Sequence, residues 1–166
     1  MRRGQLRFVA LCGAALLLGS VLARPATAQT NALIGTWKLN VAKSKYTPGP
    51  PAKEQTITYA AVPNGLKATV TGVDGSGNKM AYGYTAYFDG KDVTETGVGT
   101  PNGSDTVGAF KVVDPNTVDS VSKKAGKVVQ RTHRVVSKDG KTLTITSTGT
   151  NEKGQATNTV TVYEKQ

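Results

Sequence analysis

The sequence predicts an all-β fold: an antiparallel up-and-down meander of about 8–10 strands that closes into a barrel after an N-terminal signal peptide. Apolar and polar residues alternate in many runs rich in Thr, Val and Tyr, as in strands with one solvent-facing side. Turn-forming pairs such as Asn64-Gly65 and Asp139-Gly140 separate these runs at regular intervals. No stretch shows convincing helical periodicity, so a helical bundle, a coiled coil and a multi-domain enzyme are disfavoured.

The first residues are organised like a secretory signal peptide. Arg2, Arg3 and Arg7 form a basic start, an apolar stretch covers residues 8–23, and Ala-Thr-Ala at residues 26–28 is a small-residue cleavage site. The apolar stretch is shorter than the ~20 residues that a membrane-crossing helix usually needs, and an uncleaved anchor is the alternative. Export is therefore the favoured interpretation.

Cleavage near Ala28 divides the chain into a signal peptide at residues 1–28 and a single barrel domain at residues 29–166. The only cysteine, Cys12, lies in the removed segment, so the mature domain is held together without disulfides. Loss of the four arginines of the signal segment lowers the net charge from +10 to +6. The remaining lysines are dispersed, which favours solubility over nucleic-acid binding. We predict a periplasmic or secreted protein with no stable membrane anchor and no nucleic-acid partner.

Within the domain, turn signals divide the chain into about ten strands. Asn-Gly and Asp-Gly pairs tolerate the positive φ of tight hairpins. Pro115 interrupts a strand because proline has no N–H to donate to the hydrogen-bond ladder of a sheet. The segment 41–51 has room for a short helical turn before its proline-rich end stops it. We expect strands at residues 34–40, 54–62, 65–73, 79–88, 91–96, 104–113, 117–124, 127–137, 141–149 and 155–164.

Aromatic side chains recur on one face of the expected strands. In one strand the alternation places Tyr82, Tyr84 and Phe88 on the same side. Such a stripe is either the barrel core or the wall of a ligand pocket in which tyrosine hydroxyls orient the ligand. Tyr59 and Tyr163, in other strands, have the same two interpretations. All five are candidate ligand-binding residues.

The strand expected at residues 127–137 holds Arg131 and His133, the only histidine. Valine occurs on both faces of this strand, so the alternation does not decide its orientation. If Arg131 and His133 face inward, they can meet a ligand carboxylate or phosphate, which a guanidinium binds as a bidentate, charge-assisted pair. If they face outward, they are surface residues. Both are kept as candidate ligand-binding residues.

The two ends of the domain resemble known families. Residues 31–39, Asn-Ala-Leu-Ile-Gly-Thr-Trp-Lys-Leu, resemble the Gly-x-Trp opening strand of lipocalins and still more that of fatty-acid-binding proteins. Residues 160–165 are similar to the closing strand of the latter. These families form the calycin group, and the chain resembles a bacterial exported lipocalin-like domain. The resemblance implies a calycin-like barrel with a cavity for apolar ligands, in which Gly35 bends the first strand and Trp37 plugs the closed end.

The sequence departs from the fatty-acid-binding pattern at two places. The segment after the first strand is too short and too rich in proline for the helix pair that covers those barrels. Their carboxylate clamp has an arginine where Thr161 stands here, two residues before Tyr163. The clamp of that family is therefore incomplete in this chain.

No arrangement of catalytic or metal-ligating residues stands out. One histidine without cysteine partners makes no zinc site, and a Ser-His-Asp arrangement needs a convergence that spacing does not show. We predict no cofactor, no metal and no enzyme activity. An isomerase or hydrolase that uses His133 is the minor alternative.

These observations favour an exported, monomeric protein that holds a small apolar or amphipathic ligand in a barrel cavity, with affinity from burial of apolar surface. The alternative is a filled barrel whose loops bind an envelope protein, for example as a periplasmic inhibitor. A continuous void lined by Tyr82, Tyr84 and Arg131 would favour the first function. An interior filled by large side chains would favour the second.

Overall fold

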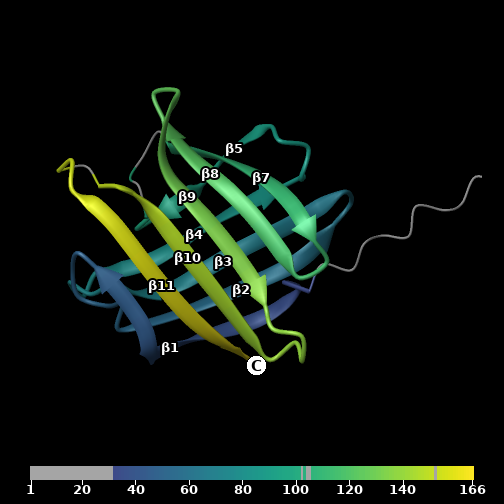
Figure 1. Cartoon of the computed structure of the whole chain (residues 1–166), viewed down its shortest axis with the longest axis horizontal. Helices are drawn as coiled ribbons and strands as arrows, with labels where there is room; N and C mark the ends of the chain where they lie inside the picture. The colour runs from purple at the N-terminus through teal and green to yellow at the C-terminus, as the bar shows by residue number, and fades with distance from the viewer. Residues whose placement is uncertain (1–31, 102, 104–105, 152) are drawn as a thin grey trace, which may run out of the picture.

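The computed structural model describes residues 32–101, 103, 106–151 and 153–166, and the expected signal peptide lies outside them. In this part of the chain, eleven antiparallel strands form one sheet that curls into a nearly closed barrel (Figure 1). The division into residues 1–28 and 29–166 stays a prediction. The strands are β1 (Gly35–Thr47), β2 (Glu54–Val62), β3 (Gly65–Val73), β4 (Lys79–Ala86), β5 (Asp92–Thr94), β6 (Thr96–Val98), β7 (Thr106–Asp114), β8 (Thr117–Lys124), β9 (Lys127–Val136), β10 (Thr142–Thr150) and β11 (Ala156–Lys165).

The strand order is that of an up-and-down barrel. Sequence neighbours pair from β1 to β4 and from β7 to β11, and β1 pairs with β11 to join the two halves. The sheet edges are β5, which pairs with β7, and β6, which pairs with β4. These two strands follow each other in the chain with Glu95 between them, so the edges meet and the barrel nearly closes. The predicted all-β, calycin-like meander is confirmed. The strand number exceeds the expected one because residues 91–96, expected as one strand, divide at Glu95.

The first strand is longer than expected. β1 continues to Thr47 through a bulge between Asn40 and Lys45, so the helical turn expected in residues 41–51 is wrong. The hydroxyl of Ser44 donates to the Asn40 carbonyl at 2.8 Å and accepts the N–H of Val162 at 3.0 Å. Because the side chain satisfies backbone groups that the bulge frees, the strand can bend without ending.

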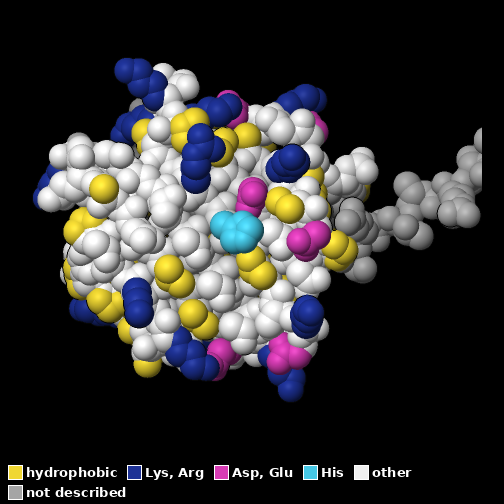
Figure 2. All heavy atoms as spheres, viewed as in Figure 1, with side chains coloured by type: hydrophobic (Ala, Val, Ile, Leu, Met, Phe, Trp, Pro, Cys, Tyr) yellow, Lys and Arg dark blue, Asp and Glu magenta, His cyan; other side chains and the backbone are white. Residues whose placement is uncertain are grey.

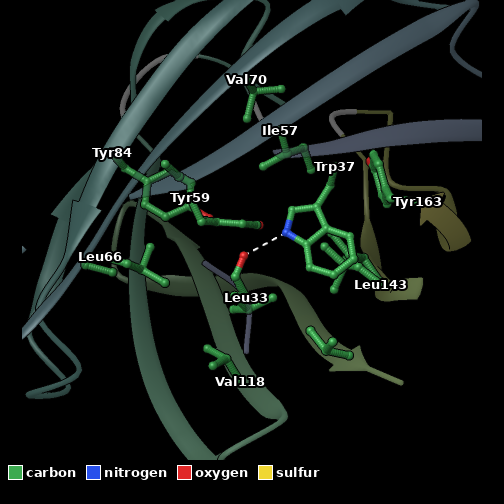
Figure 3. Close-up of a cluster of buried hydrophobic side chains, with 14 of the residues drawn as sticks. Leu33, Trp37, Ile57, Tyr59, Leu66, Val70, Tyr84, Val118, Leu143 and Tyr163 are labelled. Carbon is green, nitrogen blue, oxygen red and sulfur yellow. Dashed lines mark hydrogen bonds between the residues drawn. The ribbon is translucent and has the colours of Figure 1, made fainter. Parts of the chain in front are cut away.

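One end of the barrel is closed by side chains that are fully buried: Leu33, Trp37, Leu66, Val118, Val136 and Leu143. We call this cluster the closed end. The indole N–H of Trp37 donates to the carbonyl of Leu33 at 2.7 Å, which satisfies its one polar atom inside the cluster (Figure 3). The Lys165 ammonium lies 5.1 Å from the centre of the Trp37 ring. Gly35 has a φ of +133°, so the strand enters the cluster with a backbone angle that other residues rarely adopt.

In the residues the structure covers, no helix is long and apolar enough to cross a membrane.

Candidate ligand-binding cavity

The barrel interior beyond the closed end is a cavity of about 930 Å³. Its rim is formed by the turns at the opposite end of the strands, with Pro50 after β1, Gly75 after β3, Thr100 after β6 and Asn151 after β10 among the lining residues. We call this rim the open end. An interior of this size is at odds with a filled barrel, because packed protein cores leave few voids larger than a water molecule.

The inner part of the cavity has apolar walls. Ile57, Val70 and Ile145 line it from β2, β3 and β10, and each is at least nine-tenths buried. The rings of Tyr84 and Phe110 stack with their centres 4.8 Å apart and form a continuous aromatic surface between β4 and β7. Walls of this kind bind the apolar part of a ligand through contact area and exclusion of water.

Of the arginines that the structure describes, Arg134 lines this apolar region. Arg134 of β9 donates from Nη1 to the hydroxyl of Ser120 at 2.7 Å, and its guanidinium lies 5.3 Å from the centre of the Phe110 ring. Burial alone would lower the pKa of Arg134, but Tyr84, Tyr59 and Glu95 outweigh it. Its pKa therefore lies above the ordinary value, and the guanidinium stays a cation inside the barrel.

A carboxyl group enters the same cavity where the two sheet edges meet. Glu95 is the residue between β5 and β6, and it lines the cavity together with Arg134. Burial raises the pKa of Glu95, and the positive charge of Arg134 opposes this without cancelling it. Arg134 therefore brings a buried cation to the cavity, and Glu95 brings a buried acid that takes up a proton more readily than an exposed glutamate.

Five tyrosines of the described residues add hydroxyl groups to the lining. The hydroxyl of Tyr163 donates to Oε1 of Gln55 at 2.6 Å across the space between β11 and β2. Burial raises the pKa of Tyr82, Tyr84 and Tyr163 far enough that all three stay neutral and keep their O–H donors. Chemically, the cavity offers apolar walls with a few directed donors and acceptors.

The aromatic candidates from the sequence are placed as follows. Tyr59, Tyr82, Tyr84 and Tyr163 all line the cavity, whereas their contact with a ligand stays a prediction. Phe88 does not line it: β4 ends at Ala86, and Phe88 lies in the following turn at a φ of +54°, half-buried against the core. Its expected place within the strand is wrong because the strand ends at Ala86, while its packing against the core agrees with the core interpretation of the aromatic stripe.

Of the two orientations left open for β9, the outward one is correct. Arg131 and His133 are exposed on the outer face, so their inward placement is wrong. His133 Nδ1 lies 2.6 Å from a carboxylate oxygen of Asp119 on the neighbouring strand β8. The single histidine, cyan in Figure 2, lies in the open on the outer surface beside acidic side chains. This pair touches no cavity, and the void is lined by Arg134 instead of Arg131.

Sequence reasoning missed Arg134 and Glu95, the charged residues that the structure describes in the inner part of the cavity. A signal for Arg134 exists in the hairpin between β9 and β10. Leu143 and Ile145 face inward, and the observed pairing sets them opposite Val136 and Arg134. Counting back from the Asp-Gly turn would have given the inner face of β9, since the turn sets the register of both strands. No comparable signal exists for Glu95, which lies in a break between two three-residue strands.

Among the described residues, no group of three or more His, Cys, Asp and Glu side chains is arranged to hold a metal ion. The exposed His133 and Asp119 are two potential ligands, fewer than a zinc site uses.

Comparison with known proteins gives similarities at the level of solved structures only. No protein-family model matches the chain, and no curated protein matches it. The chain is similar to zebrafish ileal bile acid-binding protein complexed with cholic acid, at 11% identity and a TM-score of 0.47, over 81% of this chain and 99% of that one. It is also similar to Rv2717c from M. tuberculosis, at 14% identity and a TM-score of 0.49, over 86% and 98%. The calycin-like fold assigned above rests on the strand order and the interior of the barrel itself.

Proposed function

We propose that this chain is a small-molecule binding protein whose barrel cavity holds an apolar or amphipathic ligand. The observation that supports it best is the cavity of about 930 Å³, closed at one end and open at the other. A volume of this order falls within the usual range of small-molecule sites, ~300–1,000 Å³. We propose further that the protein acts by binding alone, without catalysis, and that it does so after export as a monomer.

The lining supports a ligand with an apolar body and a polar head. Ile57, Val70 and the stacked Tyr84 and Phe110 offer apolar surface. Each Å² of apolar ligand surface buried there would contribute about 25 cal/mol. Arg134 is the charged donor within this region, so the head of the ligand would lie beside it.

The alternative in which the loops bind an envelope protein has less support, because it requires an interior filled by large side chains and the barrel contains a cavity instead. The enzymatic alternative depended on His133 lying in a cleft. Its carboxylate partner Asp119 is present, but both side chains are about half exposed on the outer face. We therefore propose ligand binding in the cavity as the single function.

The direct test is a titration of the purified mature domain with Nile red, a neutral dye that fluoresces in apolar surroundings. We expect saturable binding to wild type. The variant Thr159→Trp, which places an indole at a cavity-lining position of β11, should weaken it at least about tenfold, or 1.4 kcal/mol.

The matched control is Asn158→Trp, which adds the same indole one residue earlier, on the exposed face of β11. It should bind Nile red like wild type. Equal loss of binding in both variants, or no saturable binding to wild type, would contradict the proposal. Native mass spectrometry of protein purified from its own source, followed by organic extraction, would then identify the class of bound molecule.

A further inference from the structure

Two side chains that line the cavity, Arg134 and Glu95, each carry a buried polar atom without a hydrogen-bond partner among the described residues. The atoms are Nε of Arg134 and Oε2 of Glu95, and both are closed off from solvent. Leaving a buried donor or acceptor unpaired costs ~1–3 kcal/mol, and more for charged groups. Such a cost is expected where the missing partner is a ligand.

The two side chains lie close enough to act on each other electrostatically. Both side chains line the same cavity, and both act electrostatically on Tyr82 and on Tyr84. Glu95 comes from the junction of β5 and β6, while Arg134 comes from β9. The site therefore combines an N–H donor and a carboxylate acceptor, supplied from separate parts of the barrel wall.

The charges of Arg134 and Glu95 determine which charge the head group of a ligand can carry. Arg134 contributes one positive charge and Glu95 one negative charge, so the inner cavity is balanced before a ligand binds. A carboxylate head would leave a net negative charge in a low-dielectric interior, and an ammonium head would leave a net positive one, which is unfavourable in either case. A neutral head that both accepts and donates leaves the balance intact.

We propose that Arg134 and Glu95 form a donor–acceptor subsite for a neutral ligand head, with carboxamides as its chemical class. The amide oxygen accepts from Nε of Arg134, and the amide N–H donates to Oε2 of Glu95. This subsite rests on the proposed function, because it orients a ligand whose apolar body occupies the cavity. The subsite adds to the proposed function by specifying the head group of the ligand.

A carboxylate ligand can enter the subsite only if Glu95 is protonated. The subsite thus predicts that carboxylate binding takes up a proton and strengthens as the pH falls. The described titratable or charged side chains that line the cavity with Glu95 are Arg134, Lys124 and Lys153, Asp74, and the tyrosines Tyr46, Tyr59, Tyr82, Tyr84 and Tyr163. Lys124, Lys153 and Asp74 lie at the open end, away from the inner pair.

The test compares three ligands with the same ten-carbon chain: decanamide, decanoate and decylammonium, each used to displace Nile red from wild type near neutral pH. We expect decanamide to bind at least about tenfold more tightly than either charged ligand. Decanoate affinity should rise from about pH 8 to about pH 6, with proton uptake visible in calorimetry in two buffers, while decanamide affinity stays constant.

Variants assign the effect to the two residues. Glu95→Gln keeps the shape of the side chain and removes its negative charge. The ratio of decanoate affinity to decanamide affinity should therefore be about tenfold higher in this variant than in wild type. Arg131→Gln, on the outer face of the same strand as Arg134, should leave all three affinities unchanged. If Glu95→Gln does not fold, the ranking of the three ligands and the pH series on wild type still decide.

Decanoate binding as tight as decanamide binding to wild type, with no pH dependence, would overturn the subsite. This failure differs from failure of the proposed function. If Nile red binds, Thr159→Trp weakens that binding and the three ligands compete equally well, only the subsite is wrong. If Nile red and all three ligands fail to bind, the cavity function itself is wrong.

Discussion

The two ends of the barrel are built by the same strands but differ in how their inward-facing side chains pack. On β10, Leu143 faces inward at the closed end and is fully buried, whereas Ser147 faces inward toward the open end and lines the cavity. On β8 the inward residues likewise change from Val118 to Ser122. The alternation is the same throughout, and the residue type changes along each strand. The closed end therefore provides stability, and the open end provides room for a ligand.

The largest expected effect comes from the centre of the closed end. Trp37→Ala should lower the free energy of unfolding by about 3–5 kcal/mol, because it removes a fully buried indole and leaves a cavity that its neighbours cannot fill. Since small domains have about 5–15 kcal/mol in total, this variant will be close to unfolded. Chemical denaturation followed by circular dichroism measures the loss.

Trp37→Phe is the matched variant for that measurement. It keeps an aromatic ring and removes the N–H that donates to Leu33, so its loss should be clearly smaller than that of the alanine variant. A Trp37→Ala protein as stable as wild type would show that the closed end does not hold the barrel together.

A direct comparison of the two ends uses two positions of β10 that face the same way. Leu143→Ala at the closed end should cost about 2–5 kcal/mol of unfolding free energy. Ile145→Ala, beside the cavity, should cost only about 1–2 kcal/mol, because its side chain already borders open space. Equal losses in urea denaturation would mean that the two ends are packed alike.

The charged residues of the cavity allow a smaller, pH-dependent test. Because the folded state raises the pKa of Glu95 above its ordinary 4.5, the folded protein binds more protons than the unfolded chain above that pH. Glu95 therefore lowers stability as the pH rises through this window. Relative to Glu95→Gln, wild type should lose stability as the pH rises above about 4.5, where the folded protein still holds the proton that the unfolded chain has released.

Thermal unfolding of both proteins across that range measures the difference. If wild type instead gained stability over the variant with rising pH, the attraction to Arg134 would outweigh the cost of burying the carboxylate. The cavity would then be a site of ion pairing already satisfied in the free protein.

The smallest expected change in unfolding free energy comes from substitutions in two turns, one at each end of the barrel. Asn64, in the turn between β2 and β3 beside the closed end, has a φ of +58°, and Ala125, in the turn between β8 and β9, has a φ of +47°. Asparagine tolerates this region better than alanine. Ala125→Asn should therefore raise the unfolding free energy by about 0.5–1 kcal/mol, and Asn64→Ala should lower it by a similar amount, in denaturation experiments. Changes of the opposite sign would contradict the turn geometry.

Much of the fold could be predicted from the sequence because its turns are explicit. The ranges of β2, β3 and β8 agree with the expected strands, since Gly-containing turns and a proline delimit them. The end of β1 could not be predicted, because at the bulge after Asn40 the hydroxyl of Ser44 donates to the Asn40 carbonyl and accepts the N–H of Val162, which lies in a strand at the other end of the chain.

The candidate site was predicted only where its walls are apolar. Tyr82 and Tyr84 follow a clear alternation and do line the cavity. On β9, however, the inward residues Thr132 and Arg134 are polar because they border open space, so a rule that places apolar residues inside gives no answer. Polar residues on the inner face are a consequence of the cavity, and the cavity is a property of the closed barrel rather than of any one strand.

We expect a ligand to occupy the cavity inside the barrel, between the closed end and the open end. An NMR titration of isotope-labelled mature domain with decanamide tests it most directly. We expect chemical-shift changes and intermolecular contacts at Ile57, Val70 and Ile145, with Leu143 at the closed end little affected. Contacts confined to the outer face around His133, with no change at these interior side chains, would contradict it.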